Sequence, residues 1–128
     1  MDANAMKNRT QNLGVQVIRL VESLSKGRVT DVIGKQVIRC ATSVGANYRS
    51  ACRARSRPDF IAKLGIVEEE VDEVIYWLEV LVEVGLVTEG RVEDLRKEAN
   101  EIVVIVVASI NTARRRGDRS SKPTGRLV

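Results

Sequence analysis

Residues 68–87 constrain the fold of this chain more than any other stretch, because they carry apolar side chains on two sides of one expected helix. With about 100° between successive residues of a helix, one side collects the positions Leu64, Val67, Val71, Val74, Ile75, Leu78 and Val82. The opposite side, where the helix of a monomer would present charge to water, collects Ile66, Trp77, Val80 and Val84. This helix is therefore expected to have two partners, its own bundle and another subunit.

The remaining sequence predicts three further amphipathic helices in a single domain of 128 residues. Hydrophobic residues make up 44% of the chain but aromatic residues only 3%, so we expect an aliphatic core without a pocket that stacks a base or a flat cofactor. Apolar periodicity places helices at about residues 9–24, 30–55, 56–84 and 88–116. Residues 1–8 are then a flexible N-terminus, residues 9–116 the helical domain, and residues 117–128 a disordered basic tail.

Capping residues mark the ends of these helices. Thr30 or Asp31 is expected to cap the second helix, and Ser56 and Thr88 to cap the third and fourth. Gly85 supplies a left-handed stop after the third helix. Single glycines inside the helical patterns predict points of close helix packing at Gly14, Gly34, Gly45 and Gly65.

The fourth helix repeats the apolar back of the third. Its run 102–107 is rich in β-branched residues, yet the helical stripe continues on both sides of the run, so a helix is favoured over a strand. Val104, Ile105 and Ala108 lie off the core stripe. Scattered surface valines are one interpretation, but two adjacent helices with the same pattern favour a homo-oligomeric interface. The residues predicted to form it are Ile66, Trp77, Val80, Val84, Val104 and Ile105.

Charge is segregated along the chain behind a net charge of +4. Residues 1–57 hold eleven basic and three acidic side chains, residues 58–113 hold four and thirteen, and residues 114–128 hold six and one. One interpretation is that the basic and acidic halves of the helical domain attract each other, within a subunit or between subunits. The other is that the basic surfaces bind nucleic acid.

The second expected helix carries a basic row on the face opposite its core, and further arginines follow its end. Guanidinium groups without aromatic residues between them suit phosphates better than base edges, which predicts salt-dependent binding with little sequence selectivity. An ordinary solvated helix face has the same pattern. The candidate nucleic-acid-binding residues, including those of the basic tail, are Lys35, Arg39, Arg49, Arg53, Arg55, Arg57, Arg114, Arg115 and Arg116.

No catalytic, metal or cofactor site is predicted. The chain has no histidine, and Cys40 and Cys52 lie too far apart along one helix for a disulfide, so both are expected to be buried structural thiols. The carboxylates of residues 68–73 spread around their helix, which argues against acid/base catalysis and a metal site. Because no apolar run is long enough to span a membrane and the N-terminus lacks the apolar stretch of a signal peptide, we expect a cytoplasmic protein.

Two adjoining stretches carry a resemblance to a known family: VIRCATSVGANYRSACRARSRPDF at residues 37–60 and IAKLGIVEEEVDEVIYWLEVLVEVGL at residues 61–86. They resemble the four-helix bundle proteins first noticed as products of intervening sequences inside 23S ribosomal RNA genes, over about residues 9–113. The family pattern is matched by Arg39, Cys40, Ser43, Val44, Ala46 and Asn47, then by Ser56, Asp59 and Phe60, then by Glu73, Tyr76, Trp77, Leu78 and Glu79.

This resemblance implies an all-α, antiparallel up-down-up-down four-helix bundle that assembles as a homopentamer with a central channel. A related branch, the accessory variability determinants of diversity-generating retroelements, is a basic pentamer that binds a reverse transcriptase and nucleic acid. This chain departs from the pattern at Gly45, where the family usually has proline, and in its nearly neutral helical domain.

We therefore expect a non-enzymatic bundle that binds RNA, DNA or a ribonucleoprotein partner through arginine-rich surfaces. The alternative is a protein-interaction scaffold, such as an accessory subunit of a reverse transcriptase, without nucleic-acid binding of its own.

Overall fold

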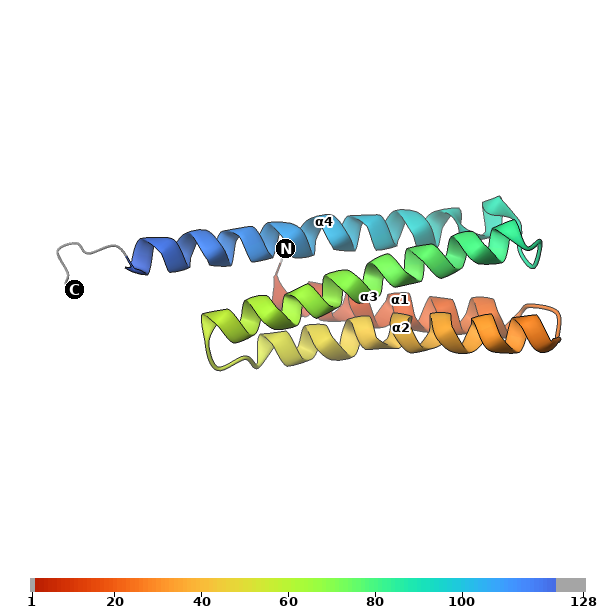
Figure 1. Cartoon of the computed structure of the whole chain (residues 1–128), viewed down its shortest axis with the longest axis horizontal. Helices are drawn as coiled ribbons and strands as arrows, with labels where there is room; N and C mark the ends of the chain where they lie inside the picture. Colours follow the sequence, from red (N-terminus) through yellow and green to blue (C-terminus); the bar gives the residue numbers. More distant parts are fainter. Residues whose placement is uncertain (1, 122–128) are drawn as a thin grey trace.

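The structure is a computed structural model that describes residues 2–121, with side chains described for residues 2–118. Its helices, in chain order, are α1 (Ala3–Glu22), α2 (Arg28–Cys52), α3 (Arg57–Glu83) and α4 (Glu89–Ser121). Each helix runs back along the one before it, and α4 also contacts α1 (Figure 1). The described chain is an all-α, up-and-down four-helix bundle, and the run 102–107 lies within α4 as predicted.

The core is a seam of aliphatic side chains that the helices share. In α3 the buried residues alternate at spacings of three and four: Leu64, Val67, Val71, Val74, Leu78 and Leu81. Ile75 and Val82, which were expected in this stripe, are only half-buried, whereas Leu81, which was not, is fully buried. The reason is that a seam between long helices repeats about every 3.5 residues, so it follows heptad positions rather than a stripe of 3.6-residue period.

The first helix begins at Ala3, so residues 3–8 are helical and the prediction of a flexible segment there is wrong. Asp2 caps the helix, because its Oδ1 accepts a hydrogen bond from the amide of Ala5 at 2.7 Å. Met6 is 2% exposed, and the hydroxyl of Thr10 donates to the carbonyl of Met6 one turn away. Burial of Met6 against the bundle stabilises a turn that apolar periodicity alone does not reveal.

Neither Thr30 nor Asp31 caps the second helix, contrary to the prediction. Helix α2 starts at Arg28 directly after Gly27. Thr30 is buried, and its hydroxyl donates to the carbonyl of Ser25 at 2.8 Å, which ties the α1–α2 connection to the first turn of α2.

Both signals at the ends of α3 are confirmed. The hydroxyl oxygen of Ser56 accepts a hydrogen bond from the amide of Asp59 at 3.2 Å, in the manner of an N-cap. After the C-cap residue Val84, Gly85 adopts a φ of +80°, a left-handed conformation that favours glycine. The α3–α4 connection can therefore be short, and α4 packs directly along α3.

Three of the four predicted glycine contacts are confirmed, and they lie between α1 and α2. A Cβ atom added at Gly14 or Gly45 would lie 3.3 Å from a backbone atom of the facing helix, and one added at Gly34 would lie 2.8 Å from a side chain of α1. The prediction is wrong for Gly65, which has open space beside it. The absence of side chains thus allows α1 and α2 to approach closely along their length.

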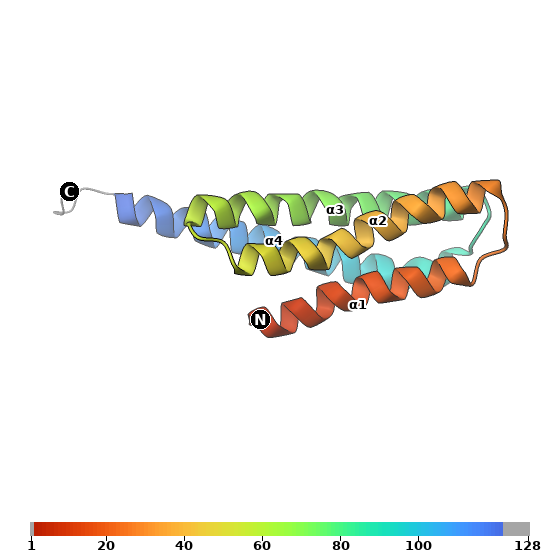
Figure 2. The same cartoon turned by 90° about the horizontal axis from the view of Figure 1, so that it is seen from below.

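The last helix continues through Gly117 to Ser121, beyond its predicted end at Arg116. Figures 1 and 2 show its final turns projecting past the α2–α3 connection, whereas α1 begins further inside the bundle. Residues 122–128, the remainder of the predicted disordered tail, lie outside the described residues. Among the described helices, none is both long and apolar enough to cross a membrane.

Candidate nucleic-acid interface

The predicted basic row of α2 is exposed, but its members have different surroundings. The row consists of Lys35, Arg39, Arg49 and Arg53. Arg39 Nη2 lies 2.5 Å from Glu73 Oε2 of α3, and its Nη1 lies 3.6 Å from Glu70 Oε1. The guanidinium of Arg39 therefore bridges α2 and α3 beside two carboxylates. This contact fits the interpretation that the basic and acidic halves of the helical domain attract each other.

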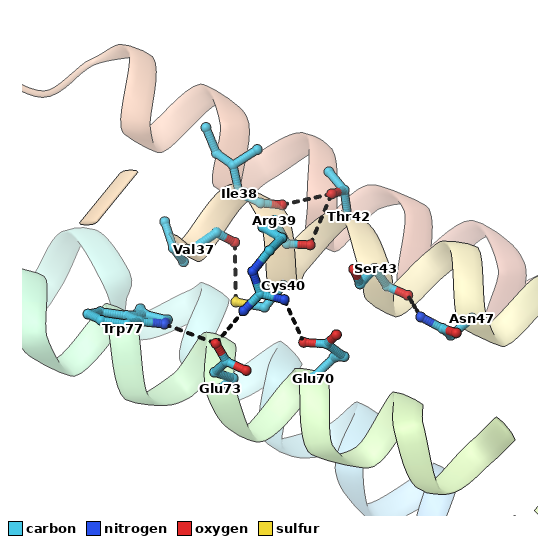
Figure 3. A network of polar contacts seen from close by, with 10 residues as sticks. All are labelled: Val37, Ile38, Arg39, Cys40, Thr42, Ser43, Asn47, Glu70, Glu73 and Trp77. Carbon is cyan, nitrogen blue, oxygen red and sulfur yellow. Dashed lines mark hydrogen bonds and ion pairs between the residues drawn. The ribbon is translucent and has the colours of Figure 1, made fainter. Parts of the chain in front are cut away.

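The carboxylate of Glu73 is the centre of this bridge (Figure 3). The indole Nε1 of Trp77 donates to the same Glu73 oxygen that Arg39 contacts, at 3.4 Å. Glu70 Oε1 is buried without a hydrogen-bond partner, and the positive charge nearest to it in this network is that of Arg39. Three residues of the family pattern, Arg39, Glu73 and Trp77, thus form a polar network across the α2–α3 contact.

The Cys40 thiol lies under this network and donates to the carbonyl of Val37 at 3.4 Å. Burial, reinforced by the negative charge of Glu73, raises the pKa of Cys40 to about 12, so the thiol stays protonated near neutral pH. Cys52 is only half-buried. The expectation of a buried structural thiol is therefore confirmed for Cys40 and only partly for Cys52.

Two other basic residues also form contacts within the bundle. Arg49 Nη2 donates to Gln11 Oε1 of α1 at 2.6 Å. Arg9 of α1, which the sequence analysis did not single out, pairs with Glu98 and Glu101 of α4. Its partners lie about ninety positions away in the sequence, so no local pattern indicates the pairing. Attraction between the basic and acidic parts of the chain therefore operates within one subunit.

The remaining predicted arginines gather at one end of the molecule, which we call the arginine end. Its members are Arg53, Arg55, Arg57, Arg114, Arg115 and Arg116, all of them exposed. The first three lie at the α2–α3 connection, and the last three lie in the C-terminal part of α4, beside the start of α3. The α3 cap and the length of α4 bring together two clusters that are distant in sequence.

A cleft of about 620 Å³ lies between the start of α3 and the end of α4 at the arginine end. It is lined by Arg57, Pro58, Ile61, Ala62, Arg114, Gly117 and Asp118. A Cβ atom at Gly117 would lie 3.2 Å from Cδ of Arg57, so the glycine allows the Arg57 side chain to lie against α4. The sequence analysis assigned this glycine to the disordered tail and missed the contact.

The acidic run 68–73 contributes the carboxylates of Glu70 and Glu73 to the Arg39 bridge. Among the residues whose side chains the structure describes, no group of three His, Cys, Asp or Glu residues lies close enough to hold a metal ion.

The predicted subunit-interface residues fall into two groups. Ile66, Val84 and Val104 are exposed, with Val104 the most exposed at 67%. Trp77, Val80 and Ile105 are half-buried and pack against the core of their own bundle. Further exposed apolar residues were missed, namely Ile18, Val29, Val32 and Tyr76. Their position off the core stripes was the available signal.

The comparisons with known proteins agree with this architecture. The family model described as 23S rRNA-intervening sequence protein matches residues 3–108 of the chain. Among solved structures, the chain is similar to a protein of unknown function from the S23 ribosomal protein family of Bacteroides thetaiotaomicron VPI-5482, with a TM-score of 0.81 and 34% sequence identity. That match covers 87% of this chain and 99% of the other. No curated protein matches the chain.

Proposed function

The chain belongs to the 23S rRNA-intervening sequence protein family, and from this premise we propose that it binds RNA through the arginine end, without a catalytic step of its own. The observation that carries the proposal is the convergence of six exposed arginines from two segments on one end of the bundle. The descriptions of the family and of the similar structure both refer to ribosomal components, which supports RNA as the nucleic acid.

The arginine end differs from the rest of the basic surface because most of its arginines form no ion pair with a described side chain. Within the described side chains, Arg53, Arg55, Arg57 and Arg114 form no ion pair, in contrast to Arg39 and Arg9. An unpaired guanidinium presents a planar fork of N–H donors that matches two phosphate oxygens. The acidic side chains of residues 58–113 repel a polyanion from the long faces of α3 and α4, which favours approach at the end of the bundle.

We also propose that the subunits assemble with copies of themselves, and that the assembly is a homopentamer. The exposed Ile66, Val84 and Val104 support self-association, because burying them in water-free contact would be favourable. In a cyclic ring whose bundle axes follow the symmetry axis, all arginine ends lie on the same rim. A single RNA can then contact several subunits, which raises its overall affinity.

A second candidate function is a protein-interaction scaffold, for example an accessory subunit of a reverse transcriptase. The observation in its favour is that the Arg39–Glu73 and Arg9–Glu98 pairs already use part of the basic surface to hold one subunit together. Under this alternative the remaining arginines contact an acidic surface of a protein partner.

Fluorescence anisotropy of labelled RNA, single-stranded DNA and duplex DNA at increasing salt concentration tests the proposal. Binding should be strong at low salt, and the logarithm of the affinity should fall linearly with the logarithm of salt concentration, by about 0.7–0.9 for each phosphate contact. Absence of binding to all three ligands at low salt would reject the nucleic-acid function in favour of the scaffold.

A further inference from the structure

The cleft at the arginine end is lined by apolar residues as well as by arginines, and phosphate groups would contact only the arginines. Its apolar lining, which we call the floor, consists of Pro58, Ile61 and Ala62 at the start of α3. Ile61 also packs against the hydrophobic core, so the floor is fixed to the body of the bundle. The volume of about 620 Å³ is within the range of sites that take small molecules.

The walls of the cleft carry charges of both signs. Arg57 of α3 and Arg114 of α4 line it, together with the carboxylate of Asp118. Unpaired bases stack on arginine guanidinium planes as well as on aromatic side chains. An apolar floor beside two guanidinium groups therefore offers a stacking surface to a base.

Gly117 fixes the position of one of these walls. Because it has no side chain, the Arg57 side chain lies against α4, 3.2 Å from where a Cβ atom would be. Three of the lining residues, Arg114, Gly117 and Asp118, follow residue 108, where the family match ends.

We propose that this cleft holds one unpaired base of a bound RNA, with its face on the Pro58–Ala62 floor and against the Arg57 and Arg114 guanidinium groups. The inference depends on the proposed RNA binding and adds a ligand preference to it. A base within a duplex is already stacked and paired, so only single-stranded or looped RNA can insert a base.

The test compares a labelled short single-stranded RNA with the blunt duplex of the same sequence, using the full chain and anisotropy. The single strand should bind roughly tenfold more tightly than the duplex, the gain expected from one stacked base. Ala62→Leu fills the floor at an exposed position without changing charge, and should abolish this preference while leaving duplex binding unchanged.

A pair of neighbouring arginines supplies the matched control. Arg114→Gln and Arg115→Gln remove the same charge from the same turn of α4, but only Arg114 lines the cleft, whereas Arg115 contacts Thr112. Both substitutions should weaken duplex binding equally, and Arg114→Gln should weaken single-strand binding roughly tenfold more than Arg115→Gln does. Circular dichroism confirms that each variant keeps its helices.

The outcomes separate the two proposals. If single strand and duplex bind equally and Arg114→Gln behaves like Arg115→Gln, the base site is wrong and the RNA-binding function stands. If neither RNA binds at low salt, the RNA-binding function is wrong, and the base site is rejected with it.

Discussion

Lys35 and Arg39 lie one turn apart on the same outer face of α2, yet only Arg39 forms ion pairs with carboxylates of α3. Arg39 is about half exposed, at 49%, so water screens its pair with Glu73, and such pairs contribute at most about 1 kcal/mol. Glu70 adds a requirement, because its buried Oε1 has no hydrogen-bond partner and lies 3.6 Å from the Arg39 guanidinium. Removing that guanidinium leaves a partly buried carboxylate without compensation.

Arg39→Gln should therefore lower the free energy of unfolding by about 1 kcal/mol. Lys35→Gln, which removes the same charge from the same helix without breaking an ion pair, should leave the free energy of unfolding unchanged. Guanidinium chloride denaturation followed by circular dichroism measures both. Equal stability of the two variants would show that the bridge contributes nothing and that the basic row is one uniform solvated surface.

At this scale the sequence predicts which face of α2 carries the arginines, because helical periodicity determines it. It does not predict which arginines are paired. The partners of Arg39 lie more than thirty positions away on another helix, so the pairing depends on the register between α2 and α3.

Helices α1 and α2 pack through glycines, whereas α3 carries a glycine with no such role. A Cβ atom at Gly45 would lie 3.3 Å from the backbone nitrogen of Gln11, and the backbone of a helix cannot easily move away. Beside Gly65 nothing lies within 4 Å. The same residue type in two helical patterns therefore has opposite consequences for stability.

Gly45→Ala should destabilise the protein by about 1–3 kcal/mol, because the added methyl group overpacks the α1–α2 contact. Gly65→Ala should stabilise it by about 0.5–1 kcal/mol, because alanine loses less backbone entropy in a helix. Thermal and chemical unfolding of the two variants decide the matter. Stabilisation by both substitutions would show that α1 and α2 do not pack as closely as described.

The four helices follow from apolar periodicity, since each carries a long stripe that must be buried. Their ends are less predictable, because the N-terminal turns depend on Asp2 and on burial of Met6, and the end of α4 depends on packing of Arg57 over Gly117. The same extension of α4 determines the candidate site. The sequence identified the arginines, but only the fold brings Arg57 and Arg114 into one cleft.

At the scale of the whole subunit, large apolar side chains at Ile66, Val84 and Val104 are exposed to solvent and do not belong to the core. The structure changes the choice of residues for testing this surface. Val80 was an obvious position from the sequence, but it packs against the core, so a charge there would also damage the bundle. Val84 and Val104 are exposed at 52% and 67%, which makes them suitable for probing association separately from folding.

Val84→Asp together with Val104→Asp should keep the helical content and dissociate the assembly, because the charges would have to be buried between subunits. Asn100→Asp, at an exposed polar position of α4, adds charge without removing apolar surface and should leave the assembly intact. Light scattering measures the mass in each case. A mass of 14.2 kDa for the unmodified chain at micromolar concentration would refute self-association.

The charge distribution of the whole molecule underlies the central claim that RNA binds at the arginine end. Arg53, Arg55 and Arg57 lie at the α2–α3 connection, and a matched set of exposed basic residues lies at the opposite end, at or near the α1–α2 connection (Figure 1). The matched set is Arg19, Lys26 and Arg28. Replacing either set with glutamine removes the same total charge.

The most direct measurement is the RNA affinity of these two triple variants as a function of salt concentration. Replacing the arginine-end set should weaken binding and make the slope of log affinity against log salt shallower by about 0.7–0.9 for each phosphate that the protein no longer neutralises. Replacing the opposite set should leave the slope nearly unchanged. Equal slopes for the two variants would contradict the account, because binding would then follow net charge rather than the arginine end.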